Sequence, residues 1–155
     1  VVALACTLIA IFGLLPWLVI QFTAMMVASS IGVWMFYVQH QFEDTYWVDS
    51  EDWDYTTAAI KGSSYYKLPK VLQWFSGNIG FHHVHHLSPM IPNYYLEKCH
   101  RSDPMFQEAQ EITLWSSLKT VNYRLWDEDA KKLIGFRQFK KQLQKENKVA
   151  LKKAA

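Results

Sequence analysis

The sequence places four histidines within five consecutive positions, at His82, His83, His85 and His86. If this segment is helical, at about 100° per residue, then His82, His85 and His86 lie within one arc of about 100° and His83 lies further round. Three imidazoles on one arc can converge on one point. Because neutral imidazole is a natural ligand for first-row transition metals, the spacing predicts a metal site on this helix.

The residue types around these histidines narrow the choice of metal. A zinc-protease helix would carry a glutamate directly after its first histidine, whereas this chain has His83 directly after His82. Zinc-finger sites need clustered cysteines, and the two cysteines, Cys6 and Cys99, are far apart in the chain. Imidazole without thiolate leaves iron, copper or zinc open, and iron is the metal suited to oxygen chemistry.

The elements that must position this site begin with a long apolar region. None of the charged residues of the chain lies within residues 1–42. This stretch exceeds the roughly 20 residues that cross a bilayer once, and it is too long for the apolar centre of a signal peptide. The chain opens at Val1, within apolar sequence and without an initiating Met, so we expect it to begin inside a membrane helix.

Two helix-breaking residues divide the apolar region. Gly13 and Pro16 predict the end of a first membrane helix, a tight turn, and a second helix over 17–38. Aromatic residues bracket the end of the second helix, as is typical of a membrane–water boundary. The chain therefore emerges from the membrane near His40.

The middle of the chain alternates short helical patterns with breaks. Residues 43–54 carry six acidic and no basic residues, which indicates a solvated loop or short helix at the interface. We expect helices over 57–61, 70–75 and 82–87, separated by segments rich in glycine, serine and proline. A further amphipathic helix is expected over 105–114.

The last part of the chain is strongly basic. Residues 131–155 contain nine Lys and Arg against one acid, Glu146. Apolar residues recur there at helical spacing, at Phe136, Phe139 and Leu143. Both a helix that lies on anionic lipid and a solvated tail helix fit this pattern. The positive charge indicates that everything after His40 is cytoplasmic.

Several motifs together resemble the membrane-bound fatty acid desaturases, and most closely the bacterial acyl-lipid omega-6 (delta-12) branch. The pattern His82-x-x-His85-His86 is similar to the third histidine box of that family. The likeness runs in order over residues 1 to about 106. It continues in VQHQFEDTYW at 38–47, GSSYYKLP at 62–69, GFHHVHHLSP at 80–89 and IPNY at 91–94.

The resemblance implies an all-α membrane protein, in which a transmembrane helical hairpin precedes a cytoplasmic helical cap that carries histidine boxes. We divide the chain accordingly into two transmembrane helices over 1–38, the first one truncated, a histidine-box metal region over 39–106, and an amphipathic basic tail over 107–155. Such proteins hold two non-haem irons with eight or more histidines in three boxes. By resemblance the metal ligands in this chain are His40, His82, His85 and His86.

The two remaining histidines have no assigned ligand role. His83 occupies a non-ligand position of the box, so we expect it at the surface, with a contact behind the ligands as the alternative. His100 has no box around it and is expected to be structural. Both should tolerate substitution better than the ligands do.

The first box (HxxxH) and the second box (HxxHH) are absent from the sequence. At most four of the required ligands are therefore present. The chain resembles the carboxy-terminal part of a desaturase, and we expect it to be incomplete as an enzyme by itself.

The resemblance also implies the reaction and its partners. The expected enzyme is an oxidoreductase that acts on paired donors: it desaturates a membrane lipid acyl chain with O2 as co-substrate and reduces the O2 to water. Electrons would come from ferredoxin or a small haem protein, docking on either the acidic segment 43–54 or the basic segment 131–153. The expected location is the bacterial inner membrane, as an integral multi-pass protein. The alternatives are a lipid or carotenoid hydroxylase or ketolase of the same scaffold, and an inactive truncated fragment.

Overall fold

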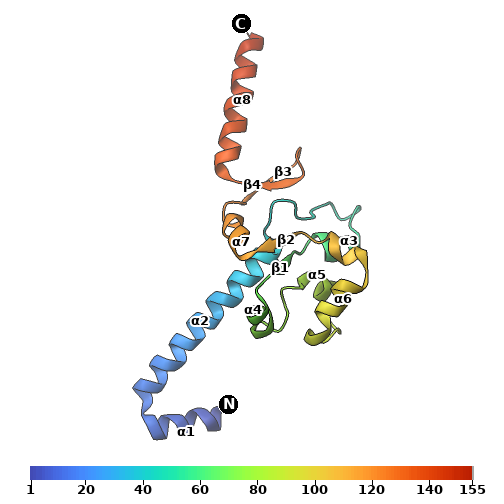
Figure 1. The fold of residues 1–155 in the computed structure, drawn as a ribbon. Helices are drawn as coiled ribbons and strands as arrows, with labels where there is room; N and C mark the ends of the chain where they lie inside the picture. Colours follow the sequence, from blue (N-terminus) through green and yellow to red (C-terminus); the bar gives the residue numbers. More distant parts are fainter. Residues whose placement is uncertain (155) are drawn as a thin grey trace. The chain divides into compact units, whose positions relative to one another are not determined.

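The computed structural model describes residues 1–154, which form two compact units (Figure 1). The first unit covers residues 1–36, and the second runs from Tyr37 to the end of the described chain. The metal ligands expected from the sequence all belong to the second unit. The proposed three-part division at residues 38 and 106 stays a prediction.

The first unit consists of α1 (Val2–Phe12) and most of α2 (Leu14–His40). The helices are separated at Gly13, whose φ of 88° lies in the left-handed region that glycine adopts without strain. The predicted break is confirmed at Gly13, but α2 begins at Leu14 and includes Pro16, so the expected start at residue 17 was wrong. Within the described residues, α2 is the one helix long and apolar enough to cross a membrane, with 27 residues and a mean hydropathy of 1.7 in its most apolar window. At 11 residues, α1 is shorter than a full crossing.

The second unit combines short helices with two small sheets. Its elements in chain order are α3 (Tyr55–Lys61), β1 (Tyr65–Lys67), α4 (Lys70–Phe75), α5 (His82–Leu87), the 3-10 helix η1 (Asn93–Tyr95), α6 (Leu96–Ser102), the 3-10 helix η2 (Pro104–Glu108), β2 (Glu111–Thr113), α7 (Leu114–Thr120), β3 (Leu125–Asp127), β4 (Lys132–Ile134) and α8 (Phe136–Ala154). The acidic segment 43–54 is irregular, and the helices expected over 57–61, 70–75 and 82–87 are confirmed.

The strands correct the all-α expectation. β1 pairs with β2 in parallel, and β3 pairs with β4 as an antiparallel hairpin. The helix expected over 105–114 was wrong, because that segment forms η2 and then β2. Parallel pairing between segments distant in sequence depends on tertiary contacts, which local periodicity does not report.

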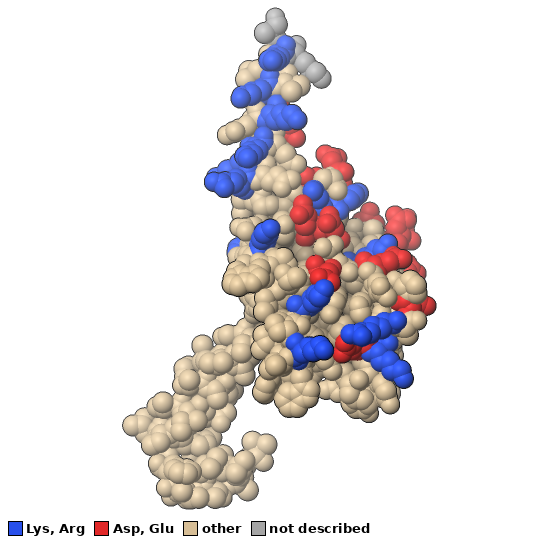
Figure 2. Space-filling view, viewed as in Figure 1, with Lys and Arg blue, Asp and Glu red and all other residues tan. Residues whose placement is uncertain are grey.

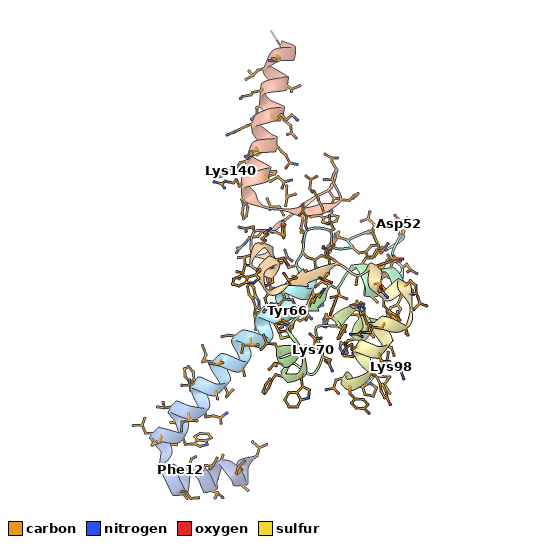
Figure 3. The ribbon with its side chains drawn as sticks, viewed as in Figure 1. Phe12, Asp52, Tyr66, Lys70, Lys98 and Lys140 are labelled. Atoms are coloured by element: carbon orange, nitrogen blue, oxygen red, sulfur yellow. The ribbon has the colours of Figure 1, made fainter. Side chains whose placement is uncertain are left out.

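The core of the second unit lies on one side of α5. Phe81 and Val84, from the start and middle of the histidine segment, are buried there. They pack against residues from α3, α6 and η2 and from the turn after η2, namely Ile60, Leu96, Phe106 and Ala109. Tyr66 of β1 (Figure 3) is also buried, at 1% exposed, and its hydroxyl lies 3.2 Å from that of Ser117. This packing fixes the rotation of α5 about its axis and hence the direction of each histidine.

Candidate metal centre

A close backbone approach fixes the start of α5. The Tyr66 amide donates to the carbonyl oxygen of Gly80 over 2.8 Å, which ties β1 to the residues just before the helix. A Cβ atom on Gly80 would lie 2.4 Å from the Tyr66 carbonyl oxygen and 2.7 Å from Oε1 of Gln73. Glycine is therefore required here by space, and α5 begins at a defined place beside β1.

A second set of hydrogen bonds fixes the end of α2 beside α5. The buried Gln39 side chain donates to the carbonyl oxygen of Ile79 over 2.8 Å, three residues before α5 begins. The Ser64 amide in turn donates to the carbonyl oxygen of Gln39 over 2.9 Å. His40, the last residue of α2, is thereby held opposite the histidine helix.

His40, His82 and His86 bring their Nε2 atoms together in a group that we call the histidine triangle. The Nε2 atoms of His40 and His86 are 3.0 Å apart, those of His40 and His82 are 3.3 Å apart, and those of His82 and His86 are 3.1 Å apart. His82 is buried, His40 is half-buried and His86 is exposed. The triangle is therefore reachable from solvent on one side.

Hydrogen bonding alone cannot satisfy the histidine triangle. In a neutral imidazole, each Nε2 either donates a proton or accepts one. With three such atoms in mutual contact, at least one pair must be donor against donor or acceptor against acceptor. A shared metal ion removes this conflict, since all three nitrogens then act as acceptors.

The nitrogen separations also fit a shared metal ion. Two imidazole nitrogens bound to one ion at about 2.1 Å lie about 3.0 Å apart at a right angle and about 3.4 Å apart at a tetrahedral angle. The three observed separations fall within this range. The donor set, three imidazoles without thiolate, suits iron, copper or zinc.

The protonation of these histidines favours metal binding at neutral pH. Burial, reinforced by the neighbouring His86 and His40, lowers the pKa of His82 to about 3. The pKa of His86 is lowered as well, first by burial and then by His40 and His85. Both imidazoles are therefore neutral at pH 7, and each keeps a lone pair for a metal.

His85, the fourth expected ligand, lies apart from the histidine triangle. Its ring centre is 5.7 Å from that of His82 and 6.2 Å from that of His86. The group of donor atoms within 4.8 Å of one another contains the three triangle histidines and not His85. The structure thus brings three of the four expected ligands together.

The expectation that His83 lies at the surface was wrong. Its side chain is fully buried, and its Nε2 lies 2.9 Å from Nδ1 of His100. Burial, together with His100, lowers the pKa of His83 to about 3. The pair is flanked by Tyr65, whose ring centre is 6.1 Å from His83 and 4.8 Å from His100. His83 belongs to the core because α5 turns this face away from the triangle and toward α6.

A cavity of about 420 Å³ adjoins the histidine triangle at His40. Its walls are aromatic and apolar for the most part, and they come from the segment after α2 and from the β3–β4 hairpin. The lining residues are His40, Gln41, Thr45, Tyr46, Trp47, Gly62, Arg124, Trp126 and Leu133.

Comparison with known proteins establishes the family. A sequence model of the family described as "Fatty acid desaturase" matches residues 1–117, about three quarters of the chain. The chain therefore belongs to the fatty acid desaturase family, which confirms the resemblance drawn from the histidine box. All four expected ligands lie within the matched region.

Two relatives carry desaturase names. The chain is 51% identical over 140 residues to a "Fatty acid desaturase" of Bacillus subtilis (strain 168), a match that covers 90% of this chain and 40% of that protein. It is 32% identical over 75 residues to an "Omega-6 fatty acid desaturase, chloroplastic" of Glycine max, covering 46% of this chain and 18% of that protein. The chain thus spans less than half the length of these relatives. No solved structure matches.

Sequence reasoning missed several residues that position the site. Gln39 and Gly80 act through a buried hydrogen bond and a close backbone approach, and Tyr55 donates from its hydroxyl to the carbonyl oxygens of His86 and Leu87 over 2.9 and 3.0 Å. The position of Gln39 directly before His40 was the one available signal, since a polar residue next to a ligand is a candidate for orienting it.

Proposed function

We propose that this chain contributes ligands to a non-haem di-iron centre that uses O2 to introduce a double bond into a lipid acyl chain. The observation that carries the proposal is the histidine triangle, whose nitrogen separations fit one shared metal ion. Membership of the desaturase family supplies the reaction class.

The chemistry explains why a metal is needed. Removing two hydrogens from adjacent unactivated methylenes is beyond any acid, base or nucleophile of a protein, so the oxidising power must come from O2 at a metal. When bound, the iron pair would supply that activation of O2. Reduction of O2 to two waters takes four electrons: the acyl chain provides two, and an external donor, ferredoxin or a small haem protein, provides the other two.

The separation of the histidines supports a division of ligands between the two irons. We assign His40, His82 and His86 to one ion, because their Nε2 atoms share one point of convergence. His85 would serve the second ion, since its ring is displaced from the triangle yet stacks beside His82 at an interplanar angle of 28°. In this assignment α5 presents ligands to both ions from adjacent turns.

The apolar helix α2 supports a membrane location for this chemistry. His40 ends α2, so a site built on it would lie at the level of the membrane interface, within reach of acyl chains in the bilayer. The substrate is then a membrane lipid acyl chain. We propose a cytoplasmic site in the bacterial inner membrane on the excess of basic residues in the segment 131–155.

A chimeric enzyme tests the proposal. This chain would replace the matching segment of the Bacillus subtilis relative, and the chimera would be expressed in a host without its own desaturase. Gas chromatography and mass spectrometry of the membrane lipids should show new unsaturated acyl chains, absent with His86→Ala and retained with His100→Gln. Hydroxylated products without alkenes would contradict desaturation, and unchanged lipids with normal iron content would contradict the assigned reaction.

A further inference from the structure

Five cations lie along one side of α8 and form what we call the basic stripe. On a helix at about 100° per residue they fall within an arc of about 80°. The stripe consists of Arg137, Lys141, Lys145, Lys148 and Lys152, all exposed. Figure 2 shows cationic side chains following the length of this helix. The one acid of α8, Glu146, lies on a different side.

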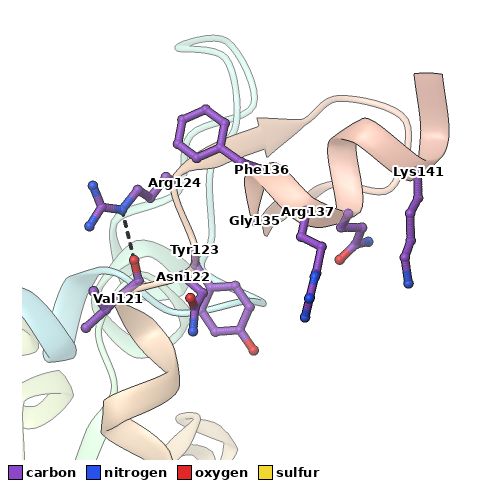
Figure 4. Close-up of a pocket in the computed structure, with 9 residues that line it drawn as sticks. Val121, Asn122, Tyr123, Arg124, Gly135, Phe136, Arg137 and Lys141 are labelled. Carbon is purple, nitrogen blue, oxygen red and sulfur yellow. Dashed lines mark hydrogen bonds between the residues drawn. The ribbon is translucent and has the colours of Figure 1, made fainter. Parts of the chain in front are cut away.

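The N-terminal end of the basic stripe borders a cavity of about 630 Å³. Arg137 and Lys141 line it from α8, and their side chains point the same way (Figure 4). Arg124 lines the cavity from the residues just before β3, where its Nε donates to the carbonyl oxygen of Val121 over 2.9 Å. These basic lining residues, with Arg137 and Lys141 projecting together, make the cavity a candidate site for an acidic group.

The apolar side of α8 faces away from the basic stripe. Phe136, Phe139 and Leu143 are centred roughly 160° around the helix from the stripe. A helix that lies on anionic lipid buries its apolar side and holds its cations near the headgroups at the boundary. Here burial of the apolar side would point the stripe away from the headgroups. Charge complementarity therefore favours an acidic protein as the occupant of the stripe.

The cavity at the base of the stripe shares one lining residue with the cavity beside the histidine triangle. Arg124 lines both this cavity and the separate one that contains His40. Trp126, two residues further along, lines the His40 cavity together with Trp47, and the two ring centres are 6.5 Å apart. A partner docked on the stripe would thus lie next to the β3–β4 hairpin, whose Trp126 and Leu133 line the cavity at His40.

We propose that the basic stripe and the cavity at its base are the docking surface for an acidic one-electron carrier protein. This inference rests on the proposed function, because a desaturase needs two external electrons. Each docked carrier is oxidised by one electron, and the metal centre is reduced by one. Two such transfers, two hydrogens from the acyl chain and two protons from solvent convert one O2 into two waters.

Matched charge reversals test the surface. The test variant carries Arg137→Glu and Lys141→Glu. The control carries Lys98→Glu on α6 and Lys140→Glu on α8, which change the net charge equally (Figure 3). By helical spacing, Lys140 lies outside the arc of the stripe. Both are prepared as the full chain in nanodiscs of neutral lipid, and the probe is an acidic plant-type [2Fe–2S] ferredoxin. The test variant should bind ferredoxin at least about tenfold more weakly, with a shallower dependence on salt, whereas the control should stay within about twofold of the parent.

Two further measurements make each outcome decisive. Circular dichroism verifies that both variants are folded, and if the double reversal unfolds the chain, Arg137→Gln with Lys141→Gln replaces it. Binding to phosphatidylglycerol vesicles is measured in parallel. Equal ferredoxin binding by test and control variants would overturn the proposal, as would selective loss of vesicle binding with ferredoxin binding intact. Ferredoxin binding is measured without added iron, so failure of the metal assignment would leave this result readable.

Discussion

Histidines lie on both sides of α5, but their contacts differ. On one side, His82 and His86 meet His40 in a group of three whose hydrogen-bonding needs cannot all be met. On the other side, His83 meets His100 in a pair, where one nitrogen donates and the other accepts. Two contacting nitrogens can form one hydrogen bond, whereas three nitrogens in mutual contact cannot all be paired and need something further.

Burial does not distinguish the two sides. The pKa values of both His82 and His83 are lowered to about 3, chiefly by burial, and each side chain is at most 8% exposed. What differs is the surroundings: the His83 pair lies among Tyr65, Phe81 and Phe106, whereas the triangle opens to solvent at His86. Access to solvent and the number of contacting imidazoles, more than burial, distinguish the candidate metal side from the core side.

The largest effect should come from Gly80→Ala, which disturbs both sides of α5 together. The new methyl group would lie 2.4 Å from the Tyr66 carbonyl oxygen, so either β1 or the start of α5 must move. We expect a loss of about 2–4 kcal/mol in the free energy of unfolding, together with loss of metal binding. Thermal melting by circular dichroism and titration with Co²⁺ measure the two effects.

Gly32→Ala is the matched control, since a Cβ atom there meets no other atom within 4 Å. It should leave both measurements nearly unchanged. Unchanged metal affinity in Gly80→Ala would show that the close approach to Tyr66 does not position the triangle.

The second-largest effect should be a loss of metal affinity without a loss of stability. His86→Ala removes one of three converging nitrogens, and we expect the affinity for Fe²⁺ or Co²⁺ to fall at least about 100-fold, because even the loss of an indirect partner of a ligand costs 10–100-fold. Since His86 is exposed, the melting temperature of the metal-free chain should change little. Co²⁺ absorption spectroscopy reports the affinity.

His100→Gln should have the opposite effect: metal affinity should stay within about threefold, and stability should fall because the contact with the buried His83 is lost. A larger loss of metal affinity in His100→Gln than in His86→Ala would mean that the roles of the two sides are reversed.

The sequence was sufficient to predict helix α5 and to name the histidines of the candidate site, because both follow from local patterns. Residues 82–87 bring their histidines together by helical spacing alone, and His40 follows directly from the end of an apolar helix. The separation of His85 from the triangle could not be read this way, because an arc of about 100° still spans more than one metal position.

The sequence also failed to predict that His83 is buried, and the reason differs from that for His85. It depends on α6 and η2, whose packing against α5 is tertiary, and on His100, which carries no motif. The β1–β2 pair was missed on the same ground, since each strand has three residues and its partner is distant in sequence. Local patterns thus name the candidate ligands, whereas long-range contacts decide which of these histidines come together.

Acid should weaken the core side of α5. The pKa of His83 is lowered from 6.5 to about 3 in the folded chain, so below pH 6.5 the unfolded state binds the proton more readily. The stabilising contribution is complete above pH 6.5 and is lost as the pH falls from 6.5 toward 3. Between pH 7 and pH 5 we expect a loss of about 2 kcal/mol from this residue.

The metal-free chain is the sample for this measurement, with unfolding followed at a series of pH values. His83→Leu should be less stable than the parent at pH 7 and should show a smaller decline with acid. Parallel pH profiles for the two proteins would rule out His83 as a source of the acid sensitivity.

The smallest effect should come from Tyr55→Phe, which removes the hydroxyl that holds the end of α5. This hydroxyl donates to the carbonyl oxygens of His86 and Leu87 over 2.9 and 3.0 Å, and Tyr55 is 51% exposed, so its loss should cost about 1 kcal/mol. Because the bond acts on the backbone of a triangle residue, metal affinity should fall about two- to fivefold. Tyr46→Phe removes a hydroxyl that donates to the Asp52 carbonyl oxygen over 3.0 Å and accepts from the Asp54 amide over 3.3 Å, both outside α5. It should cost similar stability without changing Co²⁺ affinity, and equal losses of affinity in the two variants would show that Tyr55 stabilises the fold without orienting the ligand.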